Sequence, residues 1–139
     1  MLLLSQQPKS VELRCGSSDV FEVAFHDGTE MLISSTGELL HWTCKEQNVQ
    51  YYGPALDRAI AGKPRYIDRI SVQYFNSSVD RAIRGNVRYL GNLSIVYFNS
   101  ASDEDIAGKI WHIGNHTIGY WQNGPRAGRV RSFDGRDVR

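Results

Sequence analysis

Residues 80–102 read DRAIRGNVRYLGNLSIVYFNSAS, and this stretch decides the fold because a related copy stands on each side of it. The preceding copy, residues 57–79, reads DRAIAGKPRYIDRISVQYFNSSV, and the following copy, residues 103–125, reads DEDIAGKIWHIGNHTIGYWQNGP. No residue is inserted between the copies, and residues 126–139 begin a truncated fourth one. A fixed period of 23 residues is typical of an array of small units that bury their apolar faces only against their neighbours.

Each copy has the pattern of a β-hairpin. In the middle copy, residues 87–90 form the first strand, Gly91 and Asn92 supply the turn, and residues 93–98 follow with a period of two. The residues of one face, with the residue before each turn, are predicted to form the core: Ile67, Ile70, Val72, Tyr74, Leu90, Leu93, Ile95, Tyr97, Ile113, His116, Ile118, Tyr120 and Phe133. Four glycines recur at one position, where a bulge, a close backbone approach or a flexible entry to the strand would explain them: Gly62, Gly85, Gly108 and Gly128.

The segment before the copies predicts more divergent hairpins. Residues 20–25 and 29–34 flank a His26-Asp27-Gly28 turn, residues 37–44 alternate again, and residues 49–52 resemble residues 72–75. One helical turn is expected around residues 54–60. We therefore expect one all-β domain with an N-terminal segment (1–19), divergent hairpins (20–56), three regular repeats (57–125) and the truncated repeat (126–139). The predicted fold is an antiparallel meander of about ten to twelve short strands, as an elongated twisted sheet or an open barrel.

Length and composition indicate a folded, soluble protein. The chain has 139 residues, of which 41% are apolar and 22% are charged. Residues 1–4 are apolar, but this run is too short for a signal-peptide core or a membrane span, so the expected location is the cytoplasm. In that compartment Cys15 and Cys44 are expected to be free thiols rather than a bridge.

Charge is balanced overall but not along the chain. The net charge is +1, yet residues 1–56 hold three basic and seven acidic residues, whereas residues 57–139 hold thirteen basic and eight acidic ones. Such a chain could associate head to tail, offer its basic end to an anionic partner, or simply stay soluble. The unpaired first and last strands of an open array favour a homo-oligomer.

Equivalent side chains of neighbouring copies are expected to stack about 10 Å apart, since two strand spacings separate them. A basic row with aromatic neighbours could bind a phosphate backbone or stack on bases. An aromatic row could instead present rings to a protein or a sugar. A solvated basic face and a buried aromatic layer are the alternatives. The candidate binding residues are Arg65, Arg88, Trp111, Trp121, Arg129 and Arg131.

Signatures of catalysis are missing, so neither an enzyme nor a cofactor is expected. The sequence contains no CxxC, HExxH or GxSxG motif and no phosphate-binding glycine loop. His112 and His116 flank the third turn and could hold a metal, but the other copies carry Tyr, Ile or Leu there, so no metal site is predicted. Cys15 with His26 or His41 could supply a thiol nucleophile and its base.

In its length and hairpin character the repeat resembles the membrane occupation and recognition nexus (MORN) repeat, and more loosely short bacterial β-repeats with the pattern G-K-I-x-x-I-G-x-x-x-I-x-Y. Residues 108–114, GKIWHIG, and residues 118–120, IGY, carry the bacterial pattern. The resemblance covers residues 57–139 and implies scaffolding and contact with proteins or lipids, usually without chemistry.

The sequence therefore favours a non-catalytic module for protein interaction or assembly. The alternative is an anion or nucleic-acid binder that uses Arg65, Arg88, Arg129 and Arg131. A third hypothesis is a small enzyme that uses the N-terminal cysteine and histidines.

Overall fold

Every regular element of the described chain is a β-strand. The computed structural model describes residues 6–138, so the expectations that rested on residues 1–4 and on Arg139 fall outside it. Within the described range there is no helix with the length and hydropathy to cross a membrane. The strands are β1 (Pro8–Arg14), β2 (Val20–Phe25), β3 (Glu30–Ser34), β4 (Leu39–Thr43), β5 (Val49–Tyr51), β6 (Pro64–Ile67), β7 (Ile70–Tyr74), β8 (Val87–Leu90), β9 (Leu93–Tyr97), β10 (Ile110–Ile113), β11 (His116–Tyr120), β12 (Val130–Phe133) and β13 (Arg136–Asp137).

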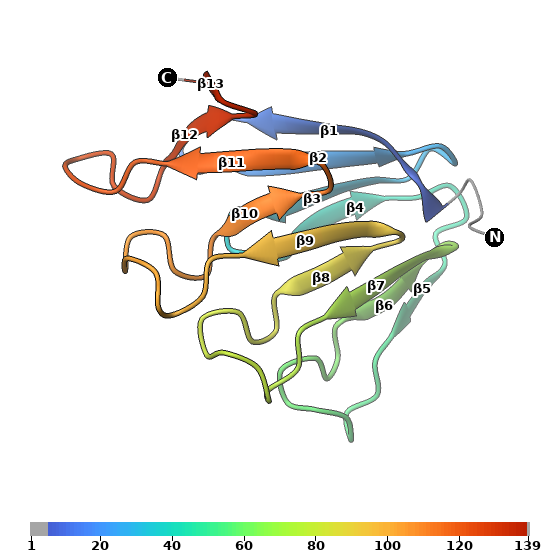
Figure 1. The fold of residues 1–139 in the computed structure, drawn as a ribbon. Helices are drawn as coiled ribbons and strands as arrows, with labels where there is room; N and C mark the ends of the chain where they lie inside the picture. Colours follow the sequence, from blue (N-terminus) through green and yellow to red (C-terminus); the bar gives the residue numbers. More distant parts are fainter. Residues whose placement is uncertain (1–5, 139) are drawn as a thin grey trace.

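The strands form two antiparallel sheets that lie face to face (Figure 1). Strands β1 to β4 make a four-stranded sheet, and β5 to β13 make a nine-stranded sheet in chain order. The all-β, antiparallel prediction is confirmed, and the hairpins β6–β7, β8–β9 and β10–β11 lie where the alternation placed them. The single meander divides into two layers because the chain changes sheet between β4 and β5, which are not paired.

Two local predictions differ from the structure. Strand β1 lies within residues 1–19, for which the sequence predicted no strand, because only Val11 and Leu13 of that polar segment pack on the core. Residues 54–60 form turns rather than a helix. The Asp57 carbonyl nevertheless accepts hydrogen bonds from the N–H groups of Ile60 (3.0 Å) and Ala61 (2.9 Å), which closes one tight turn.

The core lies between the two sheets. Its four-stranded side consists of Phe21, Val23, Phe25, Met31 and Ile33, which alternate with outward-facing residues along β2 and β3. The nine-stranded side contributes Ile67, Ile70, Val72, Val87, Leu90, Leu93, Ile95, Tyr97, Ile110, Ile113, Ile118, Tyr120 and Val130. The predicted inward face is thus confirmed at most positions. His116 is an exception, because its ring pairs with Asp134 and stays one-third exposed.

Backbone N–H groups at the first residues of three strands donate hydrogen bonds that join the two layers. The N–H of Val87 donates to the Gly37 carbonyl (2.9 Å), and that of Ile110 donates to the Ser35 carbonyl (2.8 Å). The N–H of Val130 donates to the Asp19 carboxylate (2.7 Å). Each buried donor needs an acceptor, and the four-stranded sheet supplies one. At the corresponding start of β6, Pro64 has no N–H to satisfy.

Tyrosine hydroxyl groups satisfy the carbonyl groups at the same strand starts. Tyr97 donates to the Val87 carbonyl (2.5 Å) and Tyr120 to the Ile110 carbonyl (2.6 Å). Burial raises the pKa of Tyr97 well above its usual value, so the hydroxyl remains a donor at neutral pH. These bonds explain why a tyrosine ends β9 and β11 where a purely apolar core would take a leucine or isoleucine.

The loops before β6, β8, β10 and β12 contain the recurring glycines Gly62, Gly85, Gly108 and Gly128. Gly108 has a φ of 81°, and a Cβ built there would lie 2.7 Å from the Ala82 carbonyl oxygen of the preceding loop. A close backbone approach, together with a left-handed conformation, therefore explains this glycine. Successive loops are packed on one another at this side of the sheet (Figure 1).

Candidate functional site

The outer face of the nine-stranded sheet, which points away from the four-stranded sheet, is shaped by four β-bulges. In β10, Ile110 pairs with Tyr97 and His112 pairs with Val96, so Trp111 is an extra residue between the two pairs. A bulge of this kind re-aims its extra side chain, and here that side chain lies on the outer face. The extra residues of the four register shifts form what we call the bulge row: Arg65, Arg88, Trp111 and Arg131.

Each side chain of the bulge row lies against an aromatic ring just beyond the end of the preceding strand. The guanidinium of Arg88 lies 5.3 Å from the centre of the Phe75 ring, and that of Arg131 lies 4.5 Å from the Trp121 ring. Trp111 stacks on Phe98 with 5.1 Å between ring centres and 20° between planes. We call the supporting rings the ring row: Tyr52, Phe75, Phe98 and Trp121.

A second ring flanks the first three members of the bulge row. Arg65 lies 5.6 Å from Tyr52 and 5.7 Å from Tyr66. Arg88 lies 5.5 Å from Tyr89 in addition to its contact with Phe75. Cation–π contacts of this kind hold a guanidinium in place and leave its N–H edge available. The arginines of this face are therefore ordered before any ligand arrives, which lowers the entropy cost of binding.

The ring row is neutral and itself anchored. Tyr52 donates its hydroxyl to the Val72 carbonyl at 2.8 Å. Burial raises the pKa of this hydroxyl, although the nearby Arg65 opposes the shift. Phe75 and Phe98 pack on the core, and they meet Tyr97 and Tyr120 edge-on with ring centres 6.0 and 6.2 Å apart.

The outer face combines positive charge with exposed apolar groups. Trp111 is 43% exposed and Val96 is 44% exposed, although both lie in the middle of the sheet. Within residues 6–138, the strand register places one carboxylate on this face, that of Asp137, whose Oδ1 lies 4.0 Å from the Arg131 Nε. Apart from Gly119, the remaining outward residues are polar or aromatic: Gln50, Tyr66, Ser71, Gln73, Tyr89, Ser94, His112, Thr117 and Ser132.

A hollow of about 470 Å³ opens on this face over β11. Phe98 and Trp111 form one wall, and Arg131 and Ser132 form the other. Gly119 lies between them, where the preceding hairpins carry Gln73 and Val96. The missing side chain is what leaves the hollow open.

Two of the predicted binding residues have structural partners. Arg129 donates to the Gly16 carbonyl (2.6 Å) and lies 3.3 Å from the Asp19 carboxylate, so it joins the two sheets instead of facing outward. Trp121 lies beneath Arg131 and Arg126, whose guanidinium groups are 4.5 and 5.6 Å from its ring. Of the six predicted residues, the structure brings Arg65, Arg88, Trp111 and Arg131 onto one face, with Trp121 supporting the last.

The candidate chemical groups are not brought together. His116 Nδ1 lies 2.7 Å from Asp134 Oδ2, whereas His112 Nδ1 lies 3.3 Å from the Thr117 hydroxyl. Residues 6–138 contain no group of three or more His, Cys, Asp or Glu side chains that could hold a metal. Cys15 and His26 lie beyond opposite ends of the six-residue β2, a separation of roughly 20 Å.

The two cysteines are free thiols. Cys15 is exposed, and Cys44 is partly buried. Burial raises the pKa of the Cys44 thiol, and the Asp68 carboxylate adds to the shift. Cys44 is therefore kept in the less reactive thiol form.

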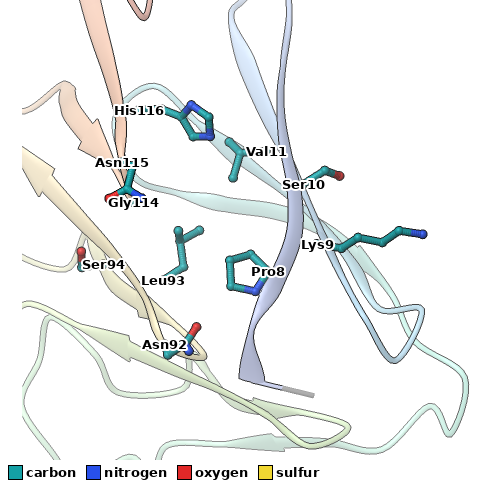
Figure 2. A pocket seen from close by; sticks show the side chains of 10 residues that line it. All are labelled: Pro8, Lys9, Ser10, Val11, Asn92, Leu93, Ser94, Gly114, Asn115 and His116. Carbon is teal, nitrogen blue, oxygen red and sulfur yellow. The ribbon is translucent and has the colours of Figure 1, made fainter. Parts of the chain in front are cut away.

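Another pocket, of about 360 Å³, lies between β1 and the turns of the hairpins β8–β9 and β10–β11 (Figure 2). The side chains of Pro8, Val11 and Leu93 point into it, whereas Lys9 and Ser10 point away. His116 stands at its edge and is already paired with Asp134. The pocket therefore combines these apolar side chains with neutral polar residues such as Asn92, Ser94 and Asn115, and its chemistry is less distinctive than that of the outer face.

Sequence reasoning missed Tyr52 as part of the site, although the match of residues 49–52 to residues 72–75 aligned it with Phe75. The spacing of apolar residues also indicates the β-bulges. Val87 and Leu90 both point inward, although residues three apart in a regular strand point to opposite faces.

No family model, curated protein or solved structure matches this chain.

Proposed function

We propose that this protein is a non-catalytic binding module, and that the outer face of its nine-stranded sheet binds another protein. The observation that carries the proposal is the stacking of Arg65 and Arg88 between two rings each, beside the exposed Trp111. Arginine, tryptophan and tyrosine are the residues that dominate the energetic centres of protein interfaces, whereas lysine and glutamate are depleted there.

The repeat is the means by which such a face is built. We regard residues 57–125 as three copies of one hairpin unit, with a partial fourth copy after them. Support comes from the bulges, since Arg65, Arg88 and Trp111 are 23 residues apart and Arg131 follows at 20. Each unit thus adds one ordered side chain to the same face. The free thiols of Cys15 and Cys44 fit a cytoplasmic location.

A nucleic-acid backbone is the second candidate, favoured by the same arginines. Their rows repeat at about 10 Å, and rings beside guanidinium groups are typical of surfaces that bind single strands. Salt distinguishes the two candidates. A phosphate-backbone binder loses affinity steeply as salt rises, whereas an interface with an apolar centre loses much less.

The test captures partners from native cytosol on the immobilised full chain, with and without nuclease. The variant Arg65→Gln/Arg88→Gln/Arg131→Gln removes three charges from the outer face. The control Arg58→Gln/Arg69→Gln/Arg81→Gln removes three from exposed loops and turns. We expect a nuclease-resistant partner that the control retains and the first variant loses. A partner lost with nuclease, together with tight binding of a single-stranded oligonucleotide at low salt only, would favour the second candidate. Capture that neither variant changes would contradict both.

A further inference from the structure

The opposite charges of the two halves of the sequence become two opposite layers in the structure. Residues 1–56, which hold seven acidic and three basic residues, supply the four-stranded sheet and β5. Residues 57–139, which hold thirteen basic and eight acidic residues, supply the rest of the nine-stranded sheet. The molecule therefore has an acidic layer and a basic layer, each with one face turned outward.

The outer face of the four-stranded sheet has one carboxylate on each of its first three strands. Glu12 pairs with Glu22 in the register of β1 and β2, and both point outward because Val23 is inward. Glu30 of β3 lies on the same face. Arg14 forms an ion pair with Glu22. A hydrogen bond and repulsion from Glu22 raise the pKa of Glu30, which shows how closely the carboxylates are placed.

This acidic face also carries apolar groups that a partner could cover. Leu40 is the extra residue of a register shift between β3 and β4 and is 47% exposed. Leu32 lies between Glu22 and His41 in the same row of the sheet. Both outer faces of the molecule thus combine exposed apolar side chains with charge, and the sign of the charge is opposite on the two faces.

We propose that the basic outer face binds the acidic outer face of a second copy of this chain, which makes head-to-tail stacks. This inference rests on the proposed function and names its partner. Charge complementarity argues for it. Arg65 and Arg88 meet no carboxylate of the described chain within ion-pair distance. Of the outward carboxylates Glu12, Glu22 and Glu30, Glu22 alone has an ion pair among the described residues, with Arg14. Such a contact uses two different surfaces, so it does not close as a twofold dimer does.

The size of the acidic face sets the expected affinity of one copy for another. Four strands of about five residues cover about 20 by 17 Å, which is less than the roughly 800 Å² that each partner buries in a standard interface. The association should therefore be weak, favoured by high protein concentration and reduced by salt.

Two charge-reversal variants of the full chain test the proposal by sedimentation equilibrium. Arg65→Glu/Arg88→Glu disables the basic face, and Glu12→Lys/Glu30→Lys disables the acidic face; all four residues are exposed. Each variant alone should be a monomer at concentrations where the unmodified chain associates. A mixture of the two should associate again, because an intact acidic face on one variant then meets an intact basic face on the other. The control Arg58→Glu/Arg81→Glu, with the same charge change in loops, should associate like the unmodified chain.

Three outcomes would overturn the proposal: an unmodified chain that stays monomeric at low salt and high concentration, a mixture that does not associate, or a single variant that associates unchanged. Circular dichroism checks that each variant is folded. The proposed function is tested separately. If the unmodified chain is monomeric but still captures a different protein through the bulge row, that result contradicts the second-copy inference and leaves the proposed function intact.

Discussion

The carboxylate of Asp19 accepts a hydrogen bond from the Val130 N–H at 2.7 Å, although 111 residues separate the two in the sequence. The Arg129 guanidinium lies 3.3 Å from the same carboxylate. Asp19 precedes β2 and Val130 begins β12, so this contact fixes the β1–β2 connection of one sheet to the next-to-last strand of the other. It occupies the position that backbone carbonyls occupy for Val87 and Ile110.

Removal of this carboxylate should destabilise the fold. Asp19→Ala leaves the buried Val130 N–H and the partly buried Arg129 without that acceptor, which should lower the free energy of unfolding by about 2 to 4 kcal/mol. Urea denaturation measures the change. The control Asp137→Ala breaks the exposed contact with Arg131 and should cost under about 0.5 kcal/mol. Equal effects of the two substitutions would show that Asp19 does not hold the layers together.

The centre of the nine-stranded sheet should depend on Ile95. Its side chain is 2% exposed and lies between the layers, so Ile95→Ala should lower the free energy of unfolding by about 2 to 4 kcal/mol. Ser94, its exposed neighbour, should tolerate alanine within about 0.5 kcal/mol. Chemical unfolding of both variants checks the assignment of the two faces, and a neutral Ile95→Ala would reverse it.

The hairpins were predictable because their signal is local. In residues 87–97 the apolar spacing and the Gly91-Asn92 turn act within a dozen residues, so the strands and the inward face of Ile95 follow from the sequence. The layer arrangement was not predictable in this way. It depends on contacts between the layers, such as Val130 with Asp19 and Ile110 with Ser35, which join residues that no periodic pattern relates.

The candidate site was likewise predictable only in part, where its residues follow the repeat. Arg65, Arg88, Trp111 and Arg131 form one row because the period puts them at one position of each unit, and this was readable from spacing. The sequence predicts a binding role for Arg129 because it is one of several basic residues near the C-terminal end. Its partner, Asp19, lies in the other layer, and only the fold reveals that this arginine is already paired.

Acid should weaken the packing of successive loops. Hydrogen bonds from Ser77 to Asp57, and from Ser100 to Asp80, hold the pKa of each carboxyl below its ordinary value of 3.8. A group whose pKa is lower in the folded state stabilises that state above its unfolded pKa and loses this contribution as pH falls through the folded value. The free energy of unfolding should therefore fall as pH drops below about 5. The variant Ser77→Ala/Ser100→Ala should show a shallower loss in urea titrations, and an unchanged slope would contradict the assignment.

Trp111 should contribute more to binding than to folding. Its indole is supported by Phe98 and His112 yet is 43% exposed, so Trp111→Ala should weaken binding of the captured partner by about 2 kcal/mol or more. Titration calorimetry with the purified partner measures this loss. The matched control is Trp42→Phe in the other layer, which should leave affinity unchanged. A Trp111→Ala variant with full affinity would mean that the arginines alone carry recognition.

The hollow over Gly119 offers a substitution that should separate stability from binding. The equivalent position of the preceding hairpin is Val96, which the outer face of the sheet accommodates. A Cβ at position 119 would lie 2.3 Å from the Ser132 Oγ, so the substitution is best made as Gly119→Val/Ser132→Ala, with Ser132→Ala alone as its control. Valine favours an extended strand more than glycine does, and the melting temperature should stay level or rise. The side chain would fill the space between Trp111 and Arg131, so affinity for a partner that enters the hollow should fall about tenfold, a loss near 1.4 kcal/mol. A double variant that melts as expected and binds like the control would show that the partner contacts the rim of the hollow without entering it.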